Sequence, residues 1–132
     1  MSGVWHEFDY AVVRCVPRVH TGAFANIGVV LLARQSGYID SAFCISSERI
    51  CALGPNFDLA LLQRFVEGYQ RVCEGGAAGG VVGLLPPSER FHWLTSLRSA
   101  MIQTSPVHPG RCRNLEEALQ RLCLEQCGGI DN

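Results

Sequence analysis

The densest group of chemically useful side chains lies between Phe91 and Gly110, in the sequence FHWLTSLRSAMIQTSPVHPG. The stretch supplies a guanidinium, several hydroxyls, a carboxamide and an imidazole, each of which can hydrogen-bond an anion or a backbone group. Two prolines and Gly110 restrict the backbone that presents these groups. The sequence therefore predicts one polar binding site here, drawn from Arg98, Ser99, Gln103, Thr104, Ser105 and His108.

His108 is the side chain best suited to acid–base chemistry, because an imidazole changes charge near neutral pH and this one is held between Pro106 and Pro109. Ser105 lies close to it, as a nucleophile lies close to its base. Such catalysis also needs an orienting acid and an oxyanion hole, and the G-x-S-x-G elbow does not occur. The residues therefore favour binding. The alternative is a hydrolase or nucleotide-processing enzyme that uses His108 as general acid/base and Arg98 to stabilise negative charge.

Polar residues also interrupt two apolar segments near the N-terminus. Arg14 lies within YAVVRCV, and its planar guanidinium suits a carboxylate or a phosphate. Asn26 and Gly28 lie within FANIGVVLLA, where an amide must find hydrogen-bond partners and a glycine weakens a strand. One interpretation is a β-bulge in which Asn26 bonds local backbone groups. The other is that Gly28 leaves room for a ligand or another segment. If the fold joins Arg14 to the later polar stretch, the combined set forms an anion site.

Hydrophobic patterning predicts the elements that position these residues. Three apolar segments predict an antiparallel meander of strands, at Tyr10–Val16, Phe24–Ala33 and Tyr38–Ile45. The second segment is apolar almost throughout, which predicts burial on both faces. Two shorter strands are expected at Phe91–Leu94 and Ala100–Thr104.

Two helices are expected where apolar residues recur at helical spacing. The first begins near Asn56 or Asp58, either of which can cap it, and ends at Gly75. The second runs from Asn114 to Cys127, and its first residues, NLEE, fit a capping box.

The segment between these helices contains the glycine-rich run of residues 75–83, GGAAGGVVG. It predicts a flexible connector, because GxGxxG, the pattern of a phosphate-binding loop, does not occur there in register. The order of elements predicts an α+β fold in a single domain over residues 1–132, an antiparallel sheet of about five strands with two helices packed on one face. A homodimer in which the strand at 24–33 extends the sheet across a two-fold axis is a further expectation.

Charge and composition exclude several classes of function. The chain has 132 residues and a formal net charge of −1, which argues against binding nucleic acid through overall positive potential. All eleven basic residues are arginine. The absence of lysine excludes Schiff-base chemistry and a P-loop lysine.

Seven cysteines occur without a CxxC pair and mostly within apolar patterns, which is typical of reduced, buried thiols. Cys123 and Cys127 could offer two thiolates on one helix face, but a tetrahedral metal site needs more ligands. We therefore expect neither a metal nor a cofactor. The first residues, MSGVWHEFDY, predict no signal peptide, and no run approaches about 20 apolar residues, so we expect no membrane association and a bacterial-type cytoplasmic location.

Three separated blocks give the chain a family resemblance. They are YAVVR followed by Pro17, FANIGVVL at residues 24–31, and the stretch from Phe91 that includes Arg98-Ser99 and ends in Gln103-x-Ser105-Pro106-x-His108. In these blocks, from about residue 8 to about residue 124, the chain resembles a small bacterial family, the domain-of-unknown-function family 3037 (DUF3037).

The resemblance implies a compact single-domain protein without an established activity. Some members are encoded beside HipA-like kinases of the toxin–antitoxin type, which implies an accessory protein or regulator. Ala23 stands where relatives often have an acidic residue, which lowers the enzyme interpretation further. We expect a non-enzymatic interaction or anion-binding module. The family motif assigns its binding residues as Arg14, Asn26, Gly28, Arg98, Ser99, Gln103, Ser105 and His108.

Overall fold

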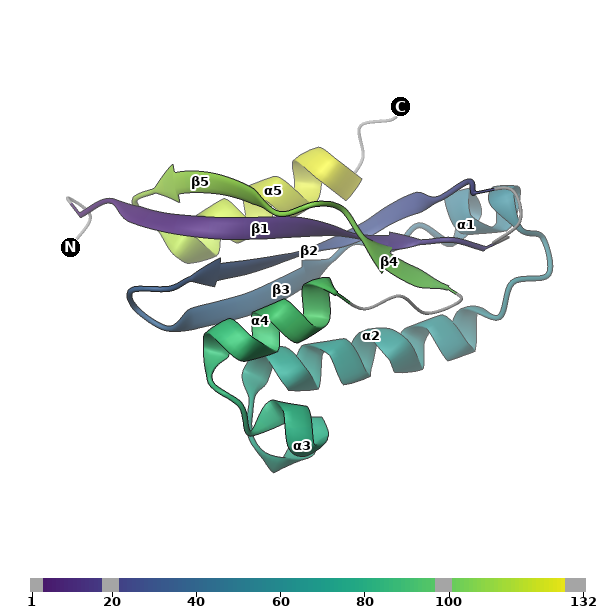
Figure 1. Cartoon of the computed structure of the whole chain (residues 1–132). Helices are drawn as coiled ribbons and strands as arrows, with labels where there is room; N and C mark the ends of the chain where they lie inside the picture. The colour runs from purple at the N-terminus through teal and green to yellow at the C-terminus, as the bar shows by residue number, and fades with distance from the viewer. Residues whose placement is uncertain (1–3, 18–21, 97–100, 128–132) are drawn as a thin grey trace.

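The computed structural model of the chain describes residues 4–17, 22–96 and 101–127 (Figure 1). Its centre is one five-stranded antiparallel sheet built from β1 (His6–Cys15), β2 (Ala25–Ala33), β3 (Tyr38–Phe43), β4 (Ile102–Thr104) and β5 (His108–Cys112). β2 lies between β1 and β3, and β4 and β5 pair in turn with the other edge of β1.

Helices cover both faces of this sheet. The helices are α1 (Ser47–Leu53), α2 (Leu59–Glu74), the 3-10 helix η2 (Ala77–Gly79), α3 (Gly80–Gly83), α4 (Pro87–Thr95) and α5 (Leu115–Cys127). In Figure 1, α2 and α4 lie below the sheet with α3 beyond them, whereas α5 lies on the other side, where it packs on β2 and β3. We call these the α2 face and the α5 face.

β2 is the middle of both hydrophobic cores. Val30 and Leu32 belong to the core under α2 and α4, whereas Val29 and Leu31 belong to the core under α5, because successive side chains of a strand point to opposite faces. All four are fully buried. The expected burial of this segment on both faces is therefore confirmed.

The α+β class and the five-stranded antiparallel sheet are confirmed. The expectation placed both helices on one face, whereas helices cover both faces of the sheet. α2 and α5 are the two predicted helices, and they lie on opposite faces. Their predicted starts are correct, since Asp58 accepts a hydrogen bond from the amide of Leu61, and Asn114 accepts one from the amide of Glu117.

The prediction of a strand at Phe91–Leu94 is wrong, because these residues belong to α4. Pro87 opens that helix, where a proline has no intrahelical hydrogen bond to lose. Phe91 and Leu94 are three apart, so a helix buries both against the sheet. A short apolar run such as FHWL fits a strand or a helix equally well. Of the other predicted strand, residues 102–104 form β4, and Ala100 lies outside the described residues.

The glycine-rich segment is folded, so the expectation of a flexible connector is wrong. It forms η2 and α3, and Arg90 of α4 reaches back to hold it. The Arg90 guanidinium donates to the carbonyls of Val72 at 2.9 Å and Cys73 at 2.6 Å, and its Nε donates to the carbonyl of Leu85 at 2.9 Å. Gly75 has φ 83°, and a Cβ there would lie 3.1 Å from this guanidinium. The glycines permit the close approach of an arginine that caps the end of α2.

The expected irregularity in β2 is a β-bulge. Val13 pairs with Gly28 but Arg14 pairs with Asn26, so Ile27 is the extra residue. A Cβ on Gly28 would lie 2.5 Å from the Phe43 ring and 2.7 Å from the carbonyl oxygen of Ala42. The space that Gly28 leaves is therefore filled by β3.

β2 is hydrogen-bonded to a strand on each side, so the expectation that this strand extends the sheet into a second copy is wrong. A homodimer formed in another way stays a prediction. The free edge on this side is β3, where the carboxylate of Asp40 accepts the backbone N–H of Ser41 at 2.8 Å. A carboxylate at an exposed edge opposes the addition of another strand. In the described part of the chain, no helix has both the length and the apolar character needed to cross a membrane.

Candidate functional site

Three of the predicted site residues lie in one row across the sheet. Arg14 on β1 is directly opposite Asn26 on β2 and, on its other side, directly opposite Gln103 on β4. Directly opposed residues project to the same face, and this is the α5 face, because the neighbouring Val13 faces the α2 core. All three side chains are partly exposed. We call Asn26, Arg14 and Gln103 the Arg14 row.

The Arg14 guanidinium is held by an aromatic ring. Its Cζ lies 4.4 Å from the centroid of the Phe24 ring, which is a cation–π contact. The Nε of Arg14 is buried and has no hydrogen-bond partner among the described residues. A buried donor without an acceptor costs about 1–3 kcal/mol of folding free energy. An acceptor atom brought by a ligand would remove this cost.

Asn26 joins the row to the end of α5. Its Nδ2 donates to the carbonyl of Gln126 at 2.8 Å, and Nη1 of Arg49 donates to the carbonyl of Cys127 at 3.2 Å. These bonds satisfy carbonyls that a helix leaves unpaired at its C-terminus. The expectation that Asn26 bonds local backbone groups is wrong, because its partner lies 100 residues away. Its Oδ1 is buried without a partner in the described part of the chain.

Ser105 and Thr104 have structural hydrogen bonds. The Ser105 hydroxyl accepts the backbone N–H of Val12 at 2.9 Å and donates to the carbonyl of Pro106 at 2.9 Å. It thereby replaces a ladder bond where the chain leaves β4 before β5. The hydroxyl of Thr104 donates to the carbonyl of Thr95 at 2.7 Å. Neither hydroxyl bonds to an imidazole.

His108 lies on the α5 face but away from the Arg14 row. It is exposed, pairs with Tyr10 across β1 and β5, and has its ring centroid 5.5 Å from that of Tyr10. Tyr10 precedes Arg14 by four residues, which is about 13 Å along a strand. The structure thus brings together Arg14, Asn26 and Gln103, but not His108. Arg98 and Ser99 lie outside the described residues.

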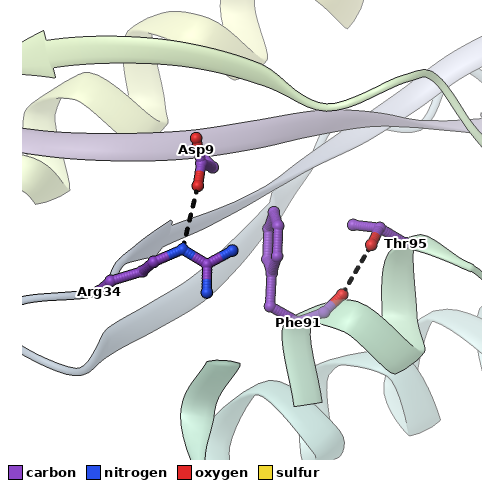
Figure 2. A network of polar contacts seen from close by, with 4 residues as sticks. All are labelled: Asp9, Arg34, Phe91 and Thr95. Carbon is purple, nitrogen blue, oxygen red and sulfur yellow. Dashed lines mark hydrogen bonds and ion pairs between the residues drawn. The ribbon is translucent and has the colours of Figure 1, made fainter. Parts of the chain in front are cut away.

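A hollow of about 740 Å³ lies elsewhere, over β1, β5 and the end of β2. Figure 2 shows its central contact, in which the Nε of Arg34 points at the carboxylate of Asp9, with an N–O distance of 3.4 Å. The Phe91 ring rises from α4 toward the sheet beside this pair, and the Thr95 hydroxyl donates to the Phe91 carbonyl within the helix. Arg111 also lines the hollow. Because the Arg34 guanidinium already has a carboxylate partner, this hollow is a weaker candidate for an anion site than the Arg14 row.

The thiols form no ligand cluster that the structure describes. Cys123 and Cys127 of α5 share a side-chain hydrogen bond, which lowers the pKa of Cys123 and, together with burial, raises the pKa of Cys127. In residues 4–17, 22–96 and 101–127, no group of three or more His, Cys, Asp or Glu side chains could hold a metal ion. These two thiols pack into the α5 core.

Sequence reasoning missed Phe24 and the two capping arginines. Phe24 could have been found, because the bend after Arg14 returns the chain beside it and an aromatic residue there suits a guanidinium. Arg49 and Arg90 bond helix ends far from them in sequence, and their sequence neighbourhoods contain no signal for this.

The family follows from comparison of the chain with known proteins. The model of the family described as "Protein of unknown function (DUF3037)" matches residues 10–126. The chain therefore belongs to the DUF3037 family. This match includes all three residues of the Arg14 row. No curated protein and no solved structure matches the chain.

Proposed function

We propose that this protein is a non-enzymatic binding module that recognises an anionic group on a partner protein at the Arg14 row. The single observation behind the proposal is the buried Nε–H of Arg14, which has no acceptor among the described residues. A phosphate or carboxylate oxygen is the strongest acceptor for a guanidinium.

The other residues of the Arg14 row indicate which second group of the ligand lies beside the anion. Asn26 offers a buried acceptor, Oδ1, beside the Arg14 donor, and the side-chain amide of Gln103 lies on the opposite side. A ligand that satisfies Arg14 and Asn26 together has an anionic oxygen next to an N–H or O–H group. A phosphorylated or acidic peptide has both, because its backbone N–H groups lie near the side-chain anion.

The family resemblance indicates which protein the partner is. HipA-like kinases are the neighbours it implies, and we propose one as the protein whose phosphorylated or acidic segment binds here. The alternative is a hydrolase or nucleotide-processing enzyme that uses His108 as general acid/base with Arg98. A nucleophilic role for Ser105 in it has less support, because the Ser105 hydroxyl both accepts from Val12 and donates to Pro106.

Co-expression with the HipA-like kinase encoded nearest to this gene tests the proposal. We expect co-elution at micromolar concentration and a change in the kinase's activity, both lost in Arg14→Met and both retained in Arg121→Met, an exposed arginine of α5 outside the Arg14 row. Failure of the wild-type proteins to co-elute would reject the kinase as partner. Equal binding by wild type and Arg14→Met would reject the Arg14 row.

A further inference from the structure

An apolar hollow of about 390 Å³ lies between α2 and α4, on the face of the sheet opposite the Arg14 row. Two helices line the hollow: α4 contributes Trp93, and α2 contributes the other side chains. Trp93 is 41% exposed although it is a large apolar side chain. The residues that line the hollow are Arg64, Phe65, Gly68, Tyr69, Val72 and Trp93.

Gly68 opens this hollow. It lies in the middle of α2, a helix of 16 residues, where glycine is less favourable than alanine. Some glycines of this chain make room for a neighbour, as Gly28 does for Phe43. A Cβ on Gly68, by contrast, would meet no atom within 4 Å, and its φ is not positive. Neither packing nor backbone conformation in the fold requires a glycine here.

Two arginines lie beside the hollow. Arg64 lines it, and Arg71 lies two turns further along the same side of α2. Seven residues separate them, which is about 10 Å along the helix. Both are exposed, and among the residues that the structure describes neither is in an ion pair. An apolar hollow with two exposed arginines along one edge matches an occupant with an apolar stripe and carboxylates along one edge.

We propose that this hollow binds an amphipathic helix of a partner protein, which places a large apolar side chain over Gly68 and two carboxylates against Arg64 and Arg71. Helices dock in grooves in this way, with apolar anchors three, four and seven residues apart. Acidic residues seven apart on the partner helix repeat the spacing of Arg64 and Arg71. The inference is independent of the proposed anion site, because the two surfaces lie on opposite faces of the sheet.

Trp93 is a reporter for this site. In a Trp5→Phe background it is the only tryptophan, since the chain has two. The probes are helical peptides of about 18 residues, five turns long. One has a leucine stripe flanked by two glutamates seven residues apart, and the other has glutamines in their place. We expect the acidic peptide to shift Trp93 emission to the blue and to bind about tenfold more tightly than the glutamine peptide.

Variants of the hollow separate binding from folding. A Cβ at position 68 meets no atom within 4 Å, so Gly68→Leu is expected to fill the hollow, to keep its melting temperature and to lose the peptide-induced shift. Ala60→Leu, at an exposed position of α2 that does not line the hollow, is the matched control and should bind normally. The double variant Arg64→Gln/Arg71→Gln should bind both peptides equally.

Three results would overturn the proposal. Equal binding of the two peptides by the wild-type hollow would remove the role of the arginines. Unchanged peptide binding by Gly68→Leu would place the peptide elsewhere. A concentration-dependent blue shift of the protein alone, with a dimer in sedimentation equilibrium, would make a second copy of this chain the occupant.

Discussion

Arg14 and Asn26 lie directly opposite each other on β1 and β2, and each has one buried polar atom without a hydrogen-bond partner among the described residues. One atom is a donor, Nε–H, and the other is an acceptor, Oδ1. Unpaired buried polar atoms are rare in folded proteins, and two on directly opposed residues call for an explanation. This pair is the physical basis of the proposed anion site.

Replacement of Arg14 by methionine should leave the protein as stable as the wild type, or more stable by about 1 kcal/mol. Methionine retains an apolar contact with Phe24 and removes a donor that has no acceptor. Urea denaturation followed by circular dichroism measures this difference. A loss of more than about 2 kcal/mol would mean that Arg14 is a structural residue, because a loss of that size is typical of a broken buried hydrogen bond.

Replacement of Arg90 by methionine should have the opposite effect. The guanidinium satisfies three carbonyls, those of Val72, Cys73 and Leu85, and its residue is only 8% exposed. We expect the free energy of unfolding to fall by about 3 kcal/mol, since bonds to charged groups are worth about 1.5–3 kcal/mol each and some are replaced by water. The exposed Arg71→Met is the control and should change stability by less than about 0.5 kcal/mol. A small effect at Arg90 would contradict the capping role.

Replacement of Gly28 by alanine should destabilise the sheet by about 2 kcal/mol. The added methyl group would overlap both the Phe43 ring and the Ala42 carbonyl. The double variant Gly28→Ala/Phe43→Ala should show a favourable coupling free energy, because it removes the ring contact while the carbonyl contact remains. Gly68→Ala is the matched control and should stabilise the protein by about 1 kcal/mol, because alanine favours a helix and nothing contacts the new atom.

The stability should fall at alkaline pH because of buried thiols. Burial raises the pKa of Cys15 from its ordinary value of 9.0 to about 11, and it is the main cause that raises the pKa of Cys73 to about 12. Between pH 9 and these values the unfolded chain loses protons that the folded chain keeps, so the free energy of unfolding decreases as pH rises. Each thiol contributes a slope of about 1.4 kcal/mol per pH unit in that interval.

Denaturation between pH 8 and about pH 11 measures this slope, with the lower limit below the ordinary thiol pKa of 9.0. The variant Cys15→Ala should show a shallower decline than the wild type over the same range. A wild-type stability that stays constant up to about pH 11 would contradict the burial of these two thiols as ionisable groups.

Much of the fold follows from local pattern. The alternation and β-branched content of β1, β2 and β3 and the caps at Asp58 and Asn114 are local signals, and the structure confirms each of them. The secondary structure of Phe91–Leu94 could not be predicted correctly, because four consecutive apolar or aromatic residues fit the spacing of a strand and that of a helix equally well. The segment 77–83 could not be predicted as helical, because its glycines disfavour a helix and the arginine that bonds the carbonyls on either side of it, Arg90, comes later in the chain.

The candidate site was predictable only in part, because some of its residues meet through strand pairing between segments far apart in the sequence. Arg14 and Asn26 meet through the register of one hairpin, and the bulge that sets the register was anticipated at Asn26–Gly28. Gln103 joins them through a pairing between segments far apart in sequence, which spacing cannot reveal. His108 was expected near Arg14, but the three residues between β4 and β5 move it along β1 to Tyr10.

The measurement that tests the anion site most directly is the ¹H–¹⁵N resonance of the Arg14 Nε–H, followed while inorganic phosphate or a phosphoserine peptide is added. The account predicts that this resonance shifts downfield and exchanges more slowly with water, because the donor gains its missing acceptor, while the Arg90 Nε–H, already bonded to the Leu85 carbonyl, stays unchanged. An Arg14 resonance that remains unchanged at millimolar ligand, while other arginines respond, would contradict it.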